Sequence, residues 1–298
     1  MSINVRPLNQ QDLSILDAFL KPHTAEAYFL RSNALSGGLA YEGKFLQGEY
    51  FGAFEADQLV GVLCYSWLHT LLVFVENNDC FSLLANAVRP ALQRREGRLD
   101  AILGLAPHAD ALIAALDIPP SAFRRDEDDG LFRLSLNGIK LPPLPERMCV
   151  RKAEDKDYEL VVSWRVAFNV EAVHAQPSEK LEREVRAEIS ERIPNGELFL
   201  LEKDGDPVSL CGVHGNIPDT KMVGPVWTPA DLRNRGYGRL AVGWALKQLY
   251  EQTPELEQAI LFASRPEAVH VYESLGFTRF ADWRLGMLKE DYRVKAAQ

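Results

Sequence analysis

Residues 233–239 combine glycines and arginines in a pattern suited to binding an anion. They read Arg-Asn-Arg-Gly-Tyr-Gly-Arg. Glycines one residue apart let the backbone turn tightly and approach a ligand, and here they open a predicted helix whose first amides lack intrahelical partners. Those amides, the positive end of the helix dipole and Arg233, Arg235 and Arg239 suit a pyrophosphate. Alone, the glycine pair also fits a basic turn between a strand and a helix.

The elements around this loop form a recognisable order. A predicted strand, Met222 to Thr228, precedes it, and a helix from Gly236 to Gln252 follows, with Val242, Leu246 and Leu249 along one apolar face. Strand and helix patterns predict the remaining elements of this half at 149–152, 157–173, 178–193, 197–203, 207–214, 258–263, 266–275 and 280–288. The predicted fold class is α/β, or α+β with a mixed sheet.

A second motif follows about 35 residues later, where Tyr272-Glu273-Ser274-Leu275-Gly276-Phe277 ends a predicted helix. Together with Arg233-x-x-Gly236-x-Gly238, this order resembles the GNAT superfamily of acyl-CoA-dependent N-acetyltransferases. The resemblance covers about residues 151–288. It implies acetyl-CoA as co-substrate and no metal, and it implies direct transfer of the acetyl group to an amine.

The resemblance also implies roles for individual residues. The strand end pairs with the pantetheine amides, the glycine loop wraps the pyrophosphate, and Tyr272 is the general acid that protonates the departing thiolate. Arg265 stands where an asparagine commonly contacts the cofactor, and it either binds a CoA phosphate or points to solvent. The expected cofactor contacts are therefore Val226, Trp227, Thr228, Arg233, Asn234, Arg235, Gly236, Tyr237, Gly238, Arg239 and Arg265.

The general base is less evident, because the strand from Met222 to Thr228 contains no Asp or Glu. The candidates are His214 and Glu171, with His174 as a third, and each is also consistent with a solvated or locally hydrogen-bonded side chain. His270 lies on a different helix face from Tyr272 and is interpreted as structural.

The chain shows an internal duplication. Val5-Arg6-Pro7-Leu8 followed by Asp12 matches Val150-Arg151-Lys152-Ala153 followed by Asp157, and each copy continues into a predicted hairpin. A proline-rich segment separates the copies. We therefore expect two tandem GNAT-like mixed-sheet domains: a degenerate copy without the CoA motif at 1–140, a linker at 141–148 and a catalytic domain at 149–298.

The first copy is not expected to bind CoA, because residues 76–81 contain two carboxylates and no glycine where the loop should recur. This half is instead expected to pack against the second half, where it could shape the acceptor pocket. Gly38 to Phe45 resembles a nucleotide phosphate loop, but Phe45 replaces the Ser or Thr that would hold magnesium, and no strand precedes it.

Composition limits the remaining possibilities. The 298 residues carry a net charge of −9, which disfavours nucleic-acid binding and mildly favours a cationic acceptor. The four cysteines lack metal or disulfide spacing, and no secretory signal is evident, so a cytoplasmic location is expected. The most apolar stretch, Leu59 to Val75, is interrupted by polar residues and predicts two buried strands instead of a membrane span.

The sequence thus predicts an N-acetyltransferase that moves an acetyl group from acetyl-CoA to a primary amine. The alternative is a non-catalytic acyl-CoA-binding or regulatory protein of the same fold. The missing strand carboxylate favours the alternative. Retention of Tyr272 favours the enzyme, since binding alone needs no acid.

Overall fold

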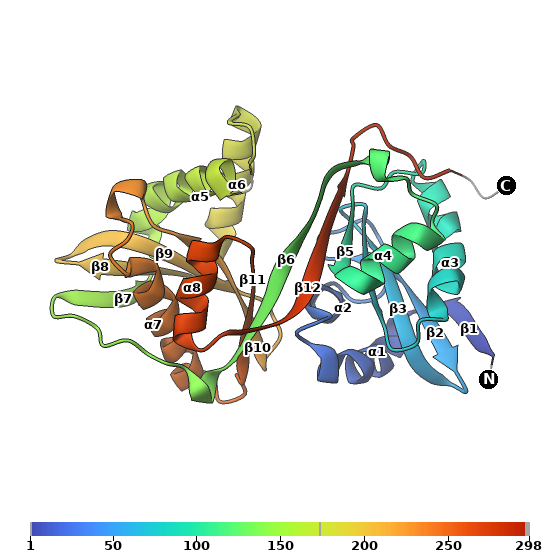
Figure 1. Ribbon diagram of the computed structural model, residues 1–298, viewed down its shortest axis with the longest axis horizontal. Helices are drawn as coiled ribbons and strands as arrows, with labels where there is room; N and C mark the ends of the chain where they lie inside the picture. Colours follow the sequence, from blue (N-terminus) through green and yellow to red (C-terminus); the bar gives the residue numbers. More distant parts are fainter. Residues whose placement is uncertain (1, 173, 296–298) are drawn as a thin grey trace. The chain divides into compact units, whose positions relative to one another are not determined.

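A computed structural model describes residues 2–172 and 174–295. Val173, the last residue of one predicted helix, lies outside the described residues. The chain divides into two compact units: unit 1 contains residues 1–131 and 280–298, and unit 2 contains residues 132–279. Each unit is a mixed sheet with helices (Figure 1), which confirms the predicted fold class.

The sheet of unit 1 has the strand order β1-β2-β3-β4-β5-β12-β6, and β4 and β5 are its parallel pair near the centre. β3 and β4 are the two buried strands expected in the apolar stretch. The elements of this unit are β1 (Ile3–Pro7), α1 (Leu13–Leu20), α2 (Tyr28–Gly37), β2 (Gly48–Glu55), β3 (Gln58–Ser66), β4 (Thr70–Val75), α3 (Cys80–Arg94), β5 (Ala101–Leu105), α4 (Ala106–Ala115) and most of β6 (Phe123–Ser135) and β12 (Thr278–Leu288).

The sheet of unit 2 has the order β6-β11-β10-β9-β8-β7, with β10 and β11 parallel. Its elements agree with the predicted ranges to within two residues at each end. They are β7 (Met148–Lys152), α5 (Tyr158–Ala172), α6 (Glu179–Arg192), β8 (Leu198–Lys203), β9 (Asp206–His214), β10 (Thr220–Trp227), α7 (Tyr237–Gln252), β11 (Gln258–Ala263) and α8 (Pro266–Leu275).

The two copies build the same corner after their first strands. Arg6 donates from both Nη atoms to Asp12, at 2.9 and 2.7 Å, and Arg151 does the same to Asp157, at 2.6 and 2.9 Å. Each aspartate carboxylate also accepts a hydrogen bond from the backbone amide of the residue three positions earlier, with an N–O distance of 2.8 Å. The arginine's hydrogen bond lowers the pKa of each carboxyl. The duplicated residues therefore do the same structural work in both units.

The division between the units differs from the predicted boundary at the prolines. β6 passes from unit 1 into unit 2, and β12 returns to unit 1, where the two strands lie side by side (Figure 1). The proline-rich segment belongs to unit 2 and packs on α7. Trp244 Nε1 donates to the carbonyl of Pro142 at 3.1 Å, and Leu141 lies over Gly243.

Apolar cores cover both faces of each sheet. In unit 1, one core contains side chains of α3 and α4, and the other contains side chains of α1 and α2. In unit 2, α7 and α8 pack on one face, and α5 and α6 pack on the other. Consecutive strand residues alternate between these cores, as Leu210 and Cys211 do on β9. Within the described residues, no helix is long and apolar enough to cross a membrane.

Candidate active site

A gap opens between the two parallel strands of unit 2. The ladder between β10 and β11 ends at Met222 and Ile260, although β10 continues to Trp227 and β11 to Ala263. The register between β10 and β9 also shifts between Val223 and Val226, so β10 bends at this point. Backbone groups on the facing edges beyond Met222 and Ile260 are consequently not used for pairing across the gap.

The predicted anion loop lies directly after β10. Asn234 has φ +61° and Gly236 has φ +76°, so the chain turns through left-handed conformations before α7 begins at Tyr237. Leu240 makes the first helical hydrogen bond, to Gly236. Among the described residues, none accepts a hydrogen bond from the backbone amides of 236–239. These are the donors that an anion at a helix start uses.

Gly238 lies against the end of β10. A Cβ placed on it would be 3.8 Å from Thr228 Oγ1 and 3.9 Å from Val226 Cγ1. The structure therefore brings the start of α7 and the predicted pantetheine strand together, as the sequence interpretation requires.

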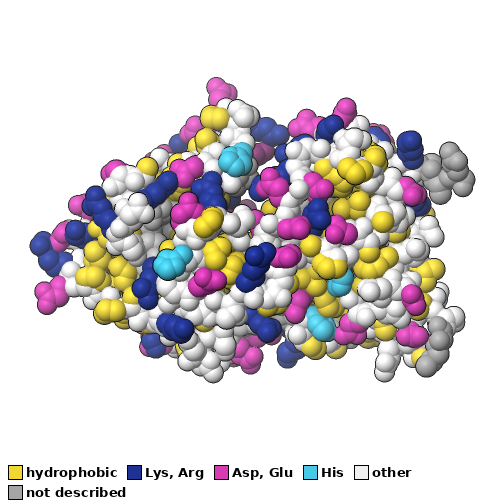
Figure 2. All heavy atoms as spheres, viewed as in Figure 1, with side chains coloured by type: hydrophobic (Ala, Val, Ile, Leu, Met, Phe, Trp, Pro, Cys, Tyr) yellow, Lys and Arg dark blue, Asp and Glu magenta, His cyan; other side chains and the backbone are white. Residues whose placement is uncertain are grey.

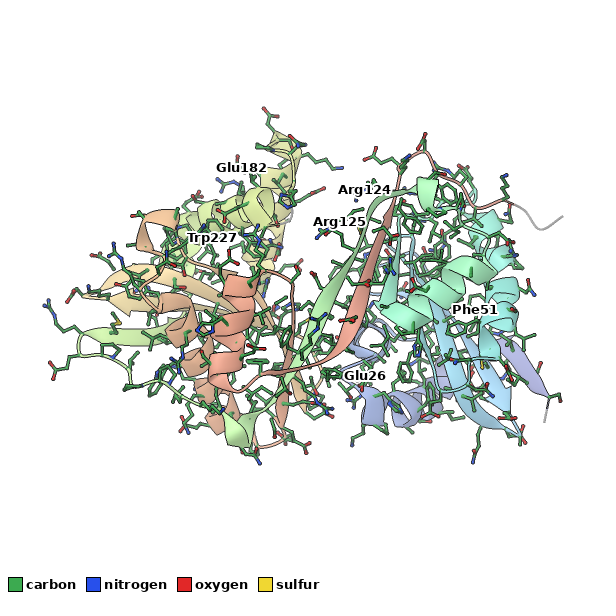
Figure 3. All side chains as sticks on the ribbon, viewed as in Figure 1. Glu26, Phe51, Arg124, Arg125, Glu182 and Trp227 are labelled. Carbon is green, nitrogen blue, oxygen red and sulfur yellow. The ribbon has the colours of Figure 1, made fainter. Side chains whose placement is uncertain are left out.

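The side chain of Arg233 is fully engaged with other protein groups. Its Nε donates to the carbonyl of Thr228 at 2.9 Å, and its guanidinium carbon lies 4.8 Å from the centroid of the Trp227 ring. Both Nη atoms donate to the Glu171 carboxylate, at 2.8 and 2.9 Å. Trp227, labelled in Figure 3, also packs edge-on against Phe168 of α5. Arg233 thus ties the loop to α5.

The other three arginines have different surroundings. Arg265, the residue before α8, donates to the backbone carbonyl of Glu171 at 2.7 Å and lies 3.5 Å from its carboxylate. Arg235 is exposed and donates to the carbonyl of Asp231. Arg239 donates from Nη2 to the carbonyl of Ser274 at 3.3 Å, and its buried Nε has no partner among the described residues.

Tyr272 projects from α8 into the core that faces β9 and β10, and its ring packs edge-on against Phe277. Burial raises its pKa well above the ordinary value, and the nearby Cys211 thiol adds to the shift. Cys211 pairs with Val226 in the sheet, so Tyr272 lies near the strand end. No described residue hydrogen-bonds to its hydroxyl. Because its pKa is raised, this hydroxyl keeps its proton at neutral pH.

Neither proposed base has the pKa expected of one. Arg233 hydrogen bonds hold the pKa of Glu171 below its usual value, with a Coulombic contribution from Arg265. Desolvation lowers the pKa of His214 from 6.5 to about 3, assisted by Arg192, Arg165 and Lys221. A general base works best with a pKa near the working pH. His174 and His270 are both exposed.

Two residues that the sequence did not indicate also support the strand end. Ser209 Oγ donates to the carbonyl of Trp227 at 3.1 Å and lies 2.9 Å from Thr228 Oγ1. Cys211 lies beneath Tyr272. Both are buried on β9, and nothing in their local sequence distinguishes them from ordinary core positions.

In unit 1, aromatic side chains occupy the equivalent place. The ladder between β4 and β5 ends at Val73 and Gly104. Just beyond it, the His108 ring lies 5.5 Å from that of Phe74 and 5.8 Å from that of Phe81, centroid to centroid. His23 packs on Phe74, and its Nε2 lies 2.8 Å from Glu76 Oε1.

Comparison with family models identifies the part of unit 2 that contains this site. Residues 158–277 match the acetyltransferase (GNAT) family model. These residues form a GNAT acetyltransferase domain. The matched region includes the glycine loop, the strand end and Tyr272, so the GNAT domain contains every residue of the candidate site described above in unit 2.

Solved structures extend the likeness to the whole chain. A tandem GNAT protein from the clavulanic acid biosynthesis pathway aligns over 100% of both chains, with a TM-score of 0.59 and 14% identity. A GNAT-family acetyltransferase from Colwellia psychrerythraea aligns over 95% of this chain and 99% of its own, with a TM-score of 0.54 and 16% identity. The chain therefore has the tandem GNAT fold. No curated protein matches its sequence.

Proposed function

We propose that the GNAT domain of unit 2 is a CoA-dependent N-acetyltransferase that transfers an acetyl group from acetyl-CoA to a primary amine. The observation that carries this proposal is the run of backbone amides at residues 236–239 that have no partner among the described residues, next to a gap between two parallel strands. A pyrophosphate fits this set of donors.

The proposed roles are those that the GNAT resemblance implies for these residues, and the geometry of the loop and strand end supports them. The loop and first turn of α7 hold the phosphates through Asn234, Arg235, Gly236, Tyr237, Gly238 and Arg239. Val226 to Thr228 offer strand amides to the pantetheine and to the oxyanion that develops during acyl transfer. Tyr272 gives its proton to the leaving thiolate, and its raised pKa keeps that proton available over the whole neutral range.

The acceptor is proposed as a class only. The net charge of −9 favours a cationic amine, as the sequence suggested. However, desolvation and three cationic side chains lower the pKa of His214 at the end of β9. The charge near this strand end is therefore locally positive, although the net charge of the chain is negative. We assign no general base, because an amine that binds in its neutral form needs only a weak proton acceptor.

Unit 1 is proposed to bind no CoA, since Phe74, Phe81 and His108 pack together where its cofactor would lie. The domain roles predicted for residues 1–140 and 149–298 are part of this proposal, and so is a cytoplasmic location. On the face shown in Figure 2, basic side chains are interspersed with acidic ones, which agrees with a protein that does not bind nucleic acid.

The test is release of free CoA thiol from acetyl-CoA with a panel of cationic, neutral and anionic primary amines. Thiol release that depends on one class of amine, with the acetylated amine detected by mass spectrometry, supports the proposal. Tight CoA binding without release for any amine favours the non-catalytic alternative. Absence of CoA binding refutes both.

A further inference from the structure

Glu171 lies between two cations that flank the cofactor gap. Arg233 follows β10, on one side of the gap, and Arg265 follows β11, on the other. Both Nη atoms of Arg233 bond to the Glu171 carboxylate, and Arg265 contacts the same residue through its carbonyl and its carboxylate. One carboxylate at the end of α5 therefore bridges both sides of the gap.

This bridge determines how much positive charge the site offers to phosphates. A guanidinium that binds a carboxylate with both Nη atoms uses the same fork that would bind a phosphate. All three nitrogens of Arg233 already have protein partners, at Thr228 and Glu171. The side chain of Glu171 remains about two-fifths exposed, at 41%, so an incoming anion can reach the pair.

We infer that Glu171 is an internal competitor for cofactor phosphate, an anion of the protein itself that occupies Arg233 and Arg265 until a phosphate replaces it. The inference rests on the proposed function, and it gives Glu171 a role other than that of a general base.

The test compares E171Q with E159Q. Glu159 is on the same helix and forms an equivalent two-point ion pair with Arg186, at 2.8 and 3.0 Å, and among the described residues it has no hydrogen bond or ion pair with the cofactor loop. Removing one exposed charge near a diphosphate is expected to lower the Kd for CoA by about threefold to fivefold. E159Q should leave that Kd unchanged. E171D, which retains the charge, should stay close to the wild type.

Two probes show whether the effect concerns phosphates. E171Q should also bind inorganic pyrophosphate more tightly than the wild type, whereas affinity for pantetheine, which has no phosphate, should not change. An unchanged or weaker affinity of E171Q for CoA overturns the inference. So does a fall in kcat of a hundredfold with an unchanged Kd, since that result would make Glu171 the base.

These outcomes are distinguishable from failure of the proposed function. Binding of CoA is measured by calorimetry without an acceptor, so it does not depend on turnover. If the wild type binds CoA but acetylates no amine, the enzyme proposal fails and the comparison of E171Q with E159Q still decides the role of Glu171.

Discussion

Replacing Tyr272 with phenylalanine should separate catalysis from stability. The substitution removes only the hydroxyl, which hydrogen-bonds to no described residue, and it keeps the ring packed against Phe277. No intramolecular hydrogen bond is lost. We therefore expect the free energy of unfolding to change by less than about 0.5 kcal/mol.

Tyr158 provides the matched control for Y272F. Its hydroxyl donates to the carbonyl of Arg186 at 3.0 Å, so Y158F should lose about 1 kcal/mol of stability. Tyr158 lies at the start of α5, and among the described residues its hydroxyl bonds only to Arg186, so Y158F should keep its kcat. Y272F should thus lose rate and keep its stability, whereas Y158F should lose stability and keep its rate.

The kinetic effect of Y272F follows from its proposed role. Losing a general acid costs about 10²-fold to 10⁴-fold in rate, and each tenfold loss corresponds to about 1.4 kcal/mol of barrier. We expect kcat at saturating acetyl-CoA to fall by at least about 10²-fold, while the Kd for CoA stays within twofold. The assay is thiol release with the best amine of the panel.

The pH profile gives an independent check. Burial raises the pKa of Tyr272, so its proton remains bound at pH values where an exposed tyrosine begins to ionise. The wild-type kcat should therefore show no decrease due to this group up to about pH 10. A Y272F enzyme with kcat within threefold of the wild type, or one destabilised by more than about 2 kcal/mol, would refute the reasoning.

Three further outcomes are expected. A Cβ at Gly238 meets only ordinary contacts, at 3.8 and 3.9 Å, so G238A should melt within about 2 °C of the wild type yet bind CoA at least tenfold more weakly; equal affinity would show that the backbone there does not approach the cofactor. The pKa of His214 is depressed from 6.5 to about 3, so the unfolded chain takes up this proton first as pH falls. The free energy of unfolding of the wild type, measured by denaturant titration, should therefore fall by about 2 kcal/mol between pH 7 and pH 5. The H214Q variant should not show this decrease. Calorimetry should find one CoA per chain, and a second equivalent would contradict the interpretation of Phe74, Phe81 and His108.

The sequence predicted the elements around the candidate site well, for a physical reason. Glycine spacing and apolar periodicity are properties of neighbouring residues, so the loop at 233–239 and the bounds of β11 and α8 followed directly from the chain. The duplication could also be predicted from the sequence, because the paired residues are close along the chain. Arg6 and Asp12 are six positions apart, as are Arg151 and Asp157.

Contacts between distant residues were not predictable in this way. Glu171 and Arg233 are 62 positions apart, and no local pattern indicates that one binds the other. The low pKa of His214 comes from desolvation, with contributions from Arg192, Arg165 and Lys221, which belong to three other elements. The prolines at 142, 143 and 145 indicated a domain boundary, but strand pairing determines the division into units. Apolar periodicity predicts that a segment such as β12 is a strand, but it does not show which sheet that strand joins.

The return of β12 to unit 1 has a consequence for synthesis of the chain. Unit 2 is continuous in sequence, whereas unit 1 needs β12, which pairs with β5 through residues 283–287. On the ribosome, all of residues 132–279 are made before this strand is available. The later half of the protein can therefore complete its sheet first, and the earlier half waits for the last strand, the reverse of the usual order in which domains fold from the N-terminus.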